Sequence, residues 1–295
     1  MILNVSGRTD IVAFYSEWFF NRYKEGFVDV RNPFNPKLVS RIYFENVDLI
    51  FFCTKNPLPI LKRIHEINKP VVFHVTITPY KSDIEPNVKE KPEIINAIKE
   101  LSQIIGVDHL VVRYDPVFIS DKYSLEYHIK AFDRLCNLLN GYVKKIIISF
   151  IDNYKNVRKN QKILNIKEFT EEDYKQIGIN FSKSANAFGM TVQTCFEDRN
   201  LVEYGFKKGE CLSHELSYKL TGKTYKNWTA RKAKKCQCVE MVDIGVYNSC
   251  RHFCKYCYAN FDELQVNNNY HLHDPNSTML IGSLKEDDIV KERIK

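Results

Sequence analysis

The chain has 295 residues, 44% of them hydrophobic and 27% charged, which is typical of a globular protein with one large domain or two ordinary ones. Its apolar runs are too short for a membrane-spanning helix, so a helical integral membrane protein is excluded. The net charge of +7 is moderate and spread along the chain, apart from one local basic run. The first residues lack the features of a secretion signal, so we expect a cytoplasmic protein, where clustered thiols bind metal or do redox chemistry more often than they form disulfides.

Short segments rich in apolar and β-branched residues recur along the chain and predict strands. Several are almost continuously apolar, which is the pattern of strands covered on both faces in a parallel sheet. The predicted strands are 2–6, 49–53, 71–76, 110–115, 146–150, 191–195 and 242–247.

Helical patterns alternate with these strands and indicate parallel βαβ units. The helical patterns at 12–26 and 125–141 end at Gly26 and Gly141, where we expect a left-handed C-cap. The number of units favours an α/β fold with a complete or partial (β/α) TIM-type barrel over an open sheet. Residues 26–44 interrupt the alternation and are predicted to form an inserted hairpin, and residues 284–294 a short helix. The helical patterns cover 12–26, 56–68, 91–106 and 125–141.

Polar side chains follow five of the predicted strands at their carboxyl ends, where a barrel carries its active site. Each of them alone is an ordinary turn or capping residue. Five strand ends that carry such residues together predict a functional site. The residues concerned are Thr9, Asp10, Thr54, Lys55, Thr76, Arg113, Asp115, Ser149 and Asp152.

Four cysteines precede the last predicted strand, and four thiolates saturate either a second iron–sulfur cluster or a structural zinc ion. Unligated thiols are the third interpretation. We expect residues 196–238 to form a cysteine-containing auxiliary segment beside a barrel made of residues 1–195 and 239–295. Cys53, Cys136 and His74 are interpreted as packed interior residues. The four cysteines are Cys195, Cys211, Cys236 and Cys238.

Three further cysteines stand close together near the end of the chain, with the spacing Cys250-x3-Cys254-x2-Cys257. One loop can thus supply three thiolates to a four-iron, four-sulfur cluster and leave the fourth iron open for a small molecule. Zinc is the alternative, and it would need a fourth ligand from a nearby histidine, namely His252, His271 or His273.

The segment Cys250-Arg-His-Phe-Cys254-Lys-Tyr256-Cys257 resembles the cysteine motif of the radical S-adenosylmethionine (SAM) enzymes. Other segments resemble the spore photoproduct lyase branch of that superfamily, and they stand at Thr9-Asp10, Thr54-Lys55, Ile84-Glu85-Pro86 and residues 113–117.

In most of that superfamily the cysteines come early in the barrel, whereas here they come last. The resemblance therefore implies a circularly permuted barrel in which residues 4–10 and 250–257 meet around one cofactor. Over its full length the chain also resembles a bacterial and archaeal family of unassigned reaction, which has SGRTDI near the N-terminus, TKNP, RYDP and a terminal CYCYAN.

The resemblance implies a role for each matching residue. Cys250, Cys254 and Cys257 would hold a [4Fe-4S] cluster, and Tyr256 would lie near the adenine of SAM. Thr9 and Asp10 would bind the methionine ammonium group, and Lys55 the methionine carboxylate. Thr76 and Ser149 would bond the ribose or the carboxylate, and Asp115 would face the cofactor or the substrate. Spore photoproduct lyase carries a radical-returning cysteine where this chain has Gly7, so the same repair reaction is not expected.

These features lead us to expect an iron–sulfur enzyme that cleaves SAM reductively to a 5'-deoxyadenosyl radical. Its partners would be an external electron donor of the flavodoxin or ferredoxin type and a substrate of the nucleic-acid or nucleotide class, with no membrane. The alternative is a non-catalytic barrel, stabilised by zinc or an iron–sulfur cluster, that binds nucleic acid through its basic run. That run is Arg231, Lys232, Lys234 and Lys235.

Overall fold

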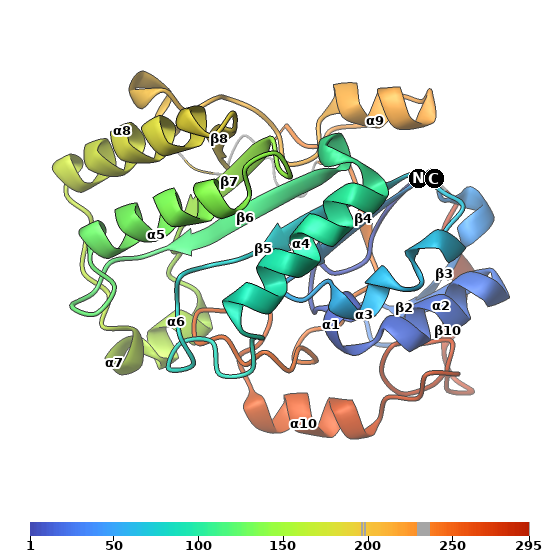
Figure 1. Ribbon diagram of the computed structural model, residues 1–295. Coiled ribbons are helices and arrows are strands. Elements are labelled where there is room, and N and C mark those ends of the chain that lie inside the picture. Colours follow the sequence, from blue (N-terminus) through green and yellow to red (C-terminus); the bar gives the residue numbers. More distant parts are fainter. Residues whose placement is uncertain (196, 198, 229–236, 295) are drawn as a thin grey trace.

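The computed structural model describes residues 1–195, 197, 199–228 and 237–294. A seven-stranded parallel sheet forms its centre, with the strand order β8-β7-β6-β5-β4-β1-β9 (Figure 1). All seven predicted strands are confirmed, although the last is only two residues long. They are β1 Ile2–Asn4, β4 Leu49–Thr54, β5 Val71–Thr76, β6 Leu110–Val117, β7 Lys145–Phe150, β8 Thr191–Thr194 and β9 Val242–Asp243.

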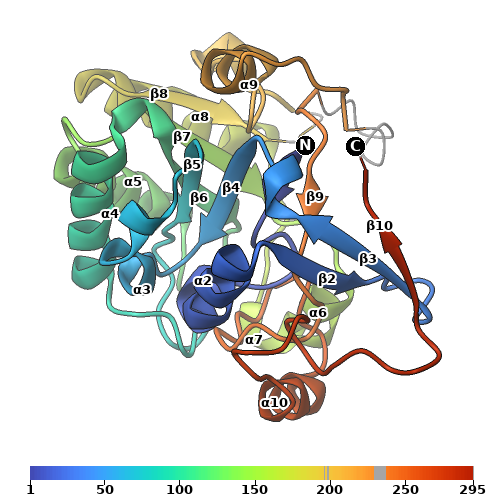
Figure 2. The ribbon, with the colours of Figure 1, turned by 90° about the vertical axis from the view of Figure 1, so that its right-hand side faces the viewer.

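The sheet is covered on both faces, as its apolar strands require. The helices α4 (Lys91–Ile105), α5 (Leu125–Leu138) and α8 (Glu171–Ala187) lie along one face (Figures 1 and 2). Alternate strand residues such as Phe73 and Val112 point into this main core. The remaining α-helices are α1 Ile11–Phe14, α2 Ser16–Glu25, α3 Leu58–Leu61, α6 Lys155–Lys159, α7 Gln161–Leu164, α9 His214–Thr221 and α10 Glu263–His271. The 3₁₀ turns are η1 Phe44–Asn46, η2 Ile64–Glu66, η3 Val107–His109 and η4 Val202–Tyr204.

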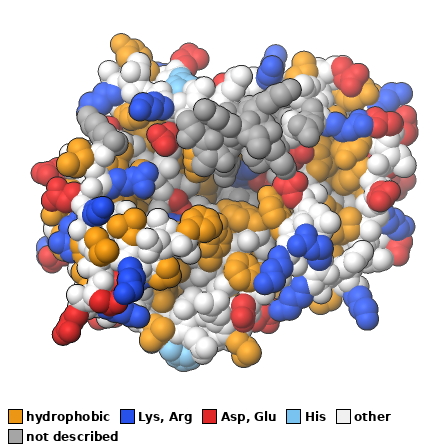
Figure 3. Space-filling model, turned by 180° about the vertical axis from the view of Figure 1, so that it is seen from behind, with side chains coloured by type: hydrophobic (Ala, Val, Ile, Leu, Met, Phe, Trp, Pro, Cys, Tyr) orange, Lys and Arg blue, Asp and Glu red, His pale blue; other side chains and the backbone are white. Residues whose placement is uncertain are grey.

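The second face of the sheet is covered by the segment that precedes β9. Strand residues of the opposite parity, such as Phe51 and Val72, pack there against Leu212, Val239 and Met241. The described part of the predicted auxiliary segment therefore packs, through Leu212, on the sheet face opposite to α4 and α5. Figure 3 shows the molecule from behind the view of Figure 1, and hydrophobic side chains gather near the middle of this face, bordered by charged residues.

The sheet stays open within the described residues, since β8 and β9 stand at its two edges and do not pair with each other. The expectation of a complete barrel is therefore not met, and the structure has an α/β fold with a parallel sheet. Among the described residues, no helix is both long and apolar enough to cross a membrane.

The hairpin expected at residues 26–44 is confirmed. Strands β2 (Phe27–Arg31) and β3 (Leu38–Tyr43) pair in antiparallel fashion and belong to a separate three-stranded sheet (Figure 2). The helix expected at 284–294 is wrong, because β10 (Ile289–Glu292) runs parallel to β3 and satisfies the free edge of that strand.

One of the two expected glycine caps is also wrong. Gly26 ends α2 in the left-handed conformation, with φ of 87°. Helix α5, however, is capped by Leu139, and Gly141 takes its positive φ of 82° in the turn that follows.

Candidate functional site

The cysteine loop and the first loop of the chain meet because β9 pairs with β1 in parallel, with Asn4 opposite Asp243. The carboxyl ends of parallel neighbours lie at one edge of a sheet, so the loops that follow the two strands are adjacent. The Gly7 amide donates to Oδ1 of Asp243 at 2.9 Å, and the Tyr15 hydroxyl donates to the Ser249 carbonyl at 2.5 Å. The Nε2 atom of His252 lies 3.0 Å from Oδ2 of Asp10, so the expected meeting of residues 4–10 and 250–257 is confirmed as a matter of geometry.

Two glycines allow this close approach. A Cβ at Gly7 would lie 2.8 Å from Cγ of Asp243 and 2.9 Å from Nδ2 of Asn4, and a Cβ at Gly245 would lie 3.0 Å from the Arg8 nitrogen. Position 7 therefore has no room for a cysteine side chain as the two loops are packed.

The three cysteines of the loop are enclosed. Cys250 and Cys254 are 8% and 5% exposed, and Cys257 is half-buried. Burial, together with Asp10 and the other two thiols, raises the pKa of Cys250, and burial also raises those of Cys254 and Cys257. The side chain of Asn260 holds the loop by bonding both backbone groups of Cys250. Thiols in this environment stay protonated unless a cationic centre replaces the protons.

Asp10 joins three segments of the site. Its Oδ1 accepts from the Ala13 amide at 3.0 Å and so caps α1, while its Oδ2 accepts from the Lys55 amide at 2.7 Å. The Nε2 atom of His252, inside the cysteine loop, lies 3.0 Å from the same Oδ2. The carboxylate thereby ties the ends of β1 and β4 to the cysteine loop, and one of its roughly four acceptor positions remains.

Thr9 stands beside this junction with an unused polar group. Its side chain is 8% exposed, and its Oγ1 atom has no hydrogen-bond partner. Buried hydroxyls are nearly always bonded, so an orphaned one fits a residue that awaits a ligand.

Lys55 is held by a carboxylate that the sequence analysis did not assign to the site. The Nζ atoms of Lys55 and Lys91 lie 2.8 Å and 2.7 Å from Glu85, and the Thr78 hydroxyl donates to Glu85 at 2.7 Å. The hydroxyl of Tyr256, which stands between two cysteines of the loop, donates to the same carboxylate. The only sequence signal for a role of Glu85 was its place in the Ile84-Glu85-Pro86 segment. The side chains that bind Glu85 come from other segments of the chain, so the sequence does not reveal them.

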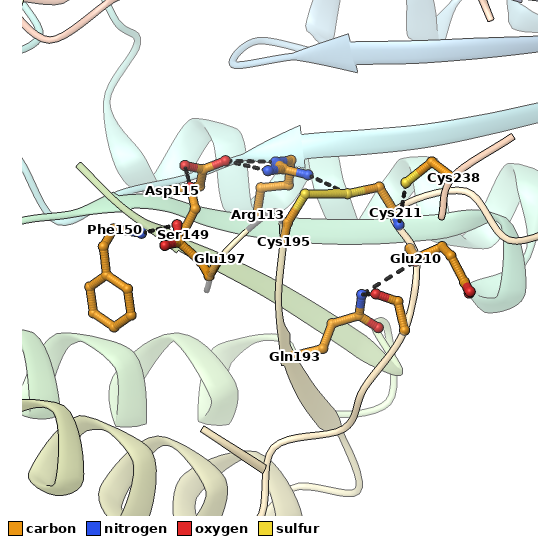
Figure 4. The surroundings of a disulfide bond; sticks show 11 residues. Arg113, Asp115, Ser149, Phe150, Gln193, Cys195, Glu197, Glu210, Cys211 and Cys238 are labelled. Carbon is orange, nitrogen blue, oxygen red and sulfur yellow. Dashed lines mark hydrogen bonds and ion pairs between the residues drawn. A yellow bond between two sulfur atoms is a disulfide. The ribbon is translucent and has the colours of Figure 1, made fainter. Parts of the chain in front are cut away.

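Thr76, Asp115 and Ser149 lie on the neighbouring strands β5, β6 and β7, and Asp115 is near enough to Lys55 to raise the pKa of that lysine. The Asp115 carboxylate accepts from the Arg113 guanidinium at 2.9 Å and from the Ser149 hydroxyl (Figure 4). Thr76 is half-buried at the end of β5, in register with Arg113. Asp115 is therefore part of a row of polar groups on the face that the auxiliary segment covers.

The structure brings three of the four auxiliary cysteines together beside Arg113. Cys195 and Cys211 are joined as a disulfide, the Cys211 amide lies 3.3 Å from Sγ of Cys238, and Nη1 of Arg113 lies 3.4 Å from Sγ of Cys211 (Figure 4). The disulfide departs from the expected set of ligands, because a metal centre there requires the reduced thiols. Cys236 and the basic run, with Arg231 and Lys235 at its ends, lie outside the described residues.

Within the described part of the chain, no three His, Cys, Asp or Glu side chains are arranged around a single metal ion. A four-iron cluster places its thiolates on different irons, so the relevant test is whether one enclosed loop offers three thiols. Cys250, Cys254 and Cys257 meet that test, and the orphaned hydroxyl of Thr9, next to Asp10 in the chain, suits a bound ligand.

A family model described as a domain of unknown function (DUF1848) matches residues 2–259. A comparison with curated proteins finds no match. Among solved structures, a candidate alpha-L-fucosidase from Bacteroides thetaiotaomicron is 12% identical with a TM-score of 0.27, and the alignment covers 77% of this chain and 84% of that one. This similarity is too distant to support a fold or a function.

Proposed function

The chain belongs to the DUF1848 family, and we propose that it is a radical SAM enzyme that holds a [4Fe-4S] cluster on Cys250, Cys254 and Cys257. When bound, such a cluster supplies the electron that cleaves SAM to methionine and a 5'-deoxyadenosyl radical, which then removes a hydrogen atom from a substrate. The fold is interpreted accordingly as a partial TIM-type barrel, circularly permuted so that β9 is the last strand of the chain and the neighbour of the first.

The observation that supports this proposal most is the meeting of the buried cysteine loop with the strand-end residues that the resemblance links to SAM. Thr9 offers an unpartnered hydroxyl, Asp10 one acceptor position, and Lys55 an ammonium group. An acceptor pair suits the methionine ammonium group, and a lysine suits its carboxylate. The burial of the cysteines excludes water from the reacting centre.

Other residues have supporting roles in the proposal. Tyr256 would lie near the adenine, and Thr76 and Ser149 would bond the ribose or the carboxylate. Asp115 faces cofactor or substrate from its pair with Arg113. An external flavodoxin or ferredoxin-like protein supplies the electron. The substrate class favoured by the resemblance to spore photoproduct lyase is a nucleic acid or nucleotide.

A second metal centre completes the proposal, with Cys195, Cys211, Cys236 and Cys238 as ligands of a further [4Fe-4S] cluster or a zinc ion. The proximity of Cys195, Cys211 and Cys238 supports it, and binding of the metal would require that the Cys195–Cys211 disulfide is reduced. Such a centre would fasten the auxiliary segment to its face of the sheet.

Formation of 5'-deoxyadenosine tests the proposed activity. Anaerobically reconstituted protein is incubated with SAM and a strong reductant, and the product is measured by chromatography. The Cys250→Ala variant should form none above background, whereas Cys136→Ala, which removes a core thiol on α5, should retain activity. Equal product from wild type and Cys250→Ala would show that the cysteine loop does not carry the reaction. Adding single-stranded DNA, RNA or nucleotides should increase the product if the substrate class is right.

A further inference from the structure

The loop after β5 is fastened directly to the cysteine loop. The Lys255 amide donates to the Ile84 carbonyl at 2.9 Å, and Nδ2 of Asn87 donates to the Arg251 carbonyl at 2.8 Å. Both contacts join segments separated by more than 160 positions in the chain. The position of the cysteine loop therefore depends on residues 84–87.

Glu85 lies at the centre of this junction. Its side chain is 1% exposed, and its two oxygens accept from four side chains, three of them at 2.7 to 2.8 Å. The fourth donor is the Tyr256 hydroxyl, and Nζ of Lys55 also lies 5.6 Å from the centre of the Tyr256 ring. A carboxylate accepts about four hydrogen bonds, so four donors fill the acceptor capacity of Glu85. The four donors fix the position of Glu85, and Glu85 in turn fixes the positions of the donor side chains.

The charges of this junction do not cancel. Glu85 carries one negative charge, while Lys55 and Lys91 carry one positive charge each. Burial would raise the pKa of Glu85, but the two ammonium groups lower it to about 2, so the carboxylate stays ionised at neutral pH. Burial would also lower the pKa of Lys55, but Glu85 and Cys254 raise it. One surplus positive charge thus lies beside the cysteine loop.

We propose that Glu85 is a positioning residue, which holds Lys55 and Tyr256 against the cysteine loop and leaves one surplus lysine charge for an incoming carboxylate. The inference rests on the proposed function where it identifies the incoming carboxylate as the carboxylate of SAM. The positioning itself can be measured in protein without metal, since it concerns contacts among the side chains of the chain.

The first test measures the reactivity of the loop thiols in metal-free, reduced protein. Iodoacetamide labelling is followed by peptide mass spectrometry for wild type, Glu85→Gln, and a control in which the exposed Glu100 on α4 becomes glutamine. Glu85→Gln should label Cys254 and Cys257 several times faster than wild type, with Cys136 unchanged as an internal reference. Glu100→Gln should match wild type. Unchanged labelling of both loop thiols in Glu85→Gln would overturn the proposal.

Tyr256→Phe gives a milder variant if loss of the buried charge prevents folding. It removes one hydroxyl and leaves the two lysine pairs of Glu85, so it should fold and label the loop thiols at a rate above wild type. A rate equal to wild type would contradict the role given to the Glu85–Tyr256 contact.

The second test measures SAM binding to anaerobically reconstituted protein by equilibrium dialysis. Glu85→Gln should bind the same amount of iron but hold SAM about tenfold more weakly, because Lys55 loses the ionised partner that fixes its position; this factor corresponds to about 1.4 kcal/mol. Affinity equal to wild type would overturn the role assigned to Glu85. If wild type assembles no cluster while the loop thiols still respond to Glu85→Gln, then the proposed function fails and the positioning role stands.

Discussion

Gly7 shows how one residue without a side chain decides how two loops pack. Its α-carbon faces Asp243 so closely that a methyl group would lie 2.8 Å from the carboxylate carbon. The sequence analysis noticed Gly7 only as a departure from a related enzyme. The reason for it became visible once β9 was found beside β1, because the crowding comes from a residue 236 positions later in the chain.

Gly7→Ala should therefore lower the free energy of unfolding by about 1–3 kcal/mol, the usual effect of overpacking. Urea unfolding measures it. Adding Asp243→Ala removes two of the three atoms that the new methyl group meets, so the double variant should lose less than the sum of the two single variants. Simple additivity of the two losses would contradict the contact.

His128 predicts a dependence of stability on pH. It is fully buried on α5, between the Tyr114 hydroxyl at 2.9 Å and the Phe118 carbonyl at 2.8 Å, and burial lowers its pKa to about 4. The unfolded chain, with a pKa near 6.5, binds a proton there that the folded chain does not bind. Stability is therefore complete above about pH 6.5 and falls as the pH is lowered toward 4. Burial lowers the pKa of His74 as well, which adds to the same trend.

At pH 5 the contribution of His128 should be about 2 kcal/mol smaller than at pH 7. His128→Asn should be less stable overall but should lose about 2 kcal/mol less than wild type between these two pH values. Unfolding in urea at both values provides the comparison. An equal loss in wild type and variant would mean that His128 is not the group responsible.

At the scale of elements, period and composition predicted the seven parallel strands well, since most of them are apolar segments that pack on both faces. They failed for residues 284–294. Charged residues dominate that stretch and resemble an exposed helix, yet Ile289 and Val290 pair with β3 while remaining largely exposed. Whether such a segment forms a strand depends on an edge partner that is far away in the sequence. The local sequence pattern carries no information about that partner.

The hairpin of β2 and β3 depends on one buried ion pair. Nε and Nη2 of Arg41 bind the two oxygens of Asp29 at 2.8 Å and 2.9 Å, and the Asp29 side chain is fully buried. Arg41→Met should destabilise the protein by about 3–5 kcal/mol, because a buried carboxylate loses its partner. Lys37→Met, which breaks the exposed pair with Asp287, should cost less than about 1 kcal/mol. Thermal unfolding of the two variants measures both losses of stability. Similar losses for Arg41→Met and Lys37→Met would show that burial does not determine the contribution of an ion pair.

At the scale of the whole molecule, the order of the strands in the sheet differs from their order in the chain. The sequence analysis could predict that the cysteine loop meets residues 4–10, because motif order together with a barrel-like topology implies a permutation. The sequence named Glu85 only as part of a motif and His252 only as an alternative zinc ligand, and the partners that these two side chains have in the site could not be predicted. Their contacts join loops after β5, β1 and β9, and only the folded chain shows which side chains reach across.

The two sets of cysteines predict the metal content of the protein. Two [4Fe-4S] clusters would give about eight irons per chain in anaerobically purified protein, and replacing Cys250, Cys254 and Cys257 by alanine should leave about four. Elemental analysis for iron and zinc measures this. About four irons with one zinc in wild type would instead assign zinc to the second set of cysteines. If the triple variant contained neither metal, the second set would hold no metal centre.

The central claim is that the cysteine loop and the strand-end residues around Asp10 and Lys55 form one site for a [4Fe-4S] cluster and SAM. The most direct measurement is the electron paramagnetic resonance spectrum of reduced, reconstituted protein before and after SAM is added. We predict a [4Fe-4S]⁺ signal that changes shape with SAM. Cys250→Ala should lack this SAM-responsive component, and any signal from a second cluster should be unaffected by SAM. A reduced wild-type protein that shows no such signal, or one whose signal is unaffected by saturating SAM, would contradict the claim.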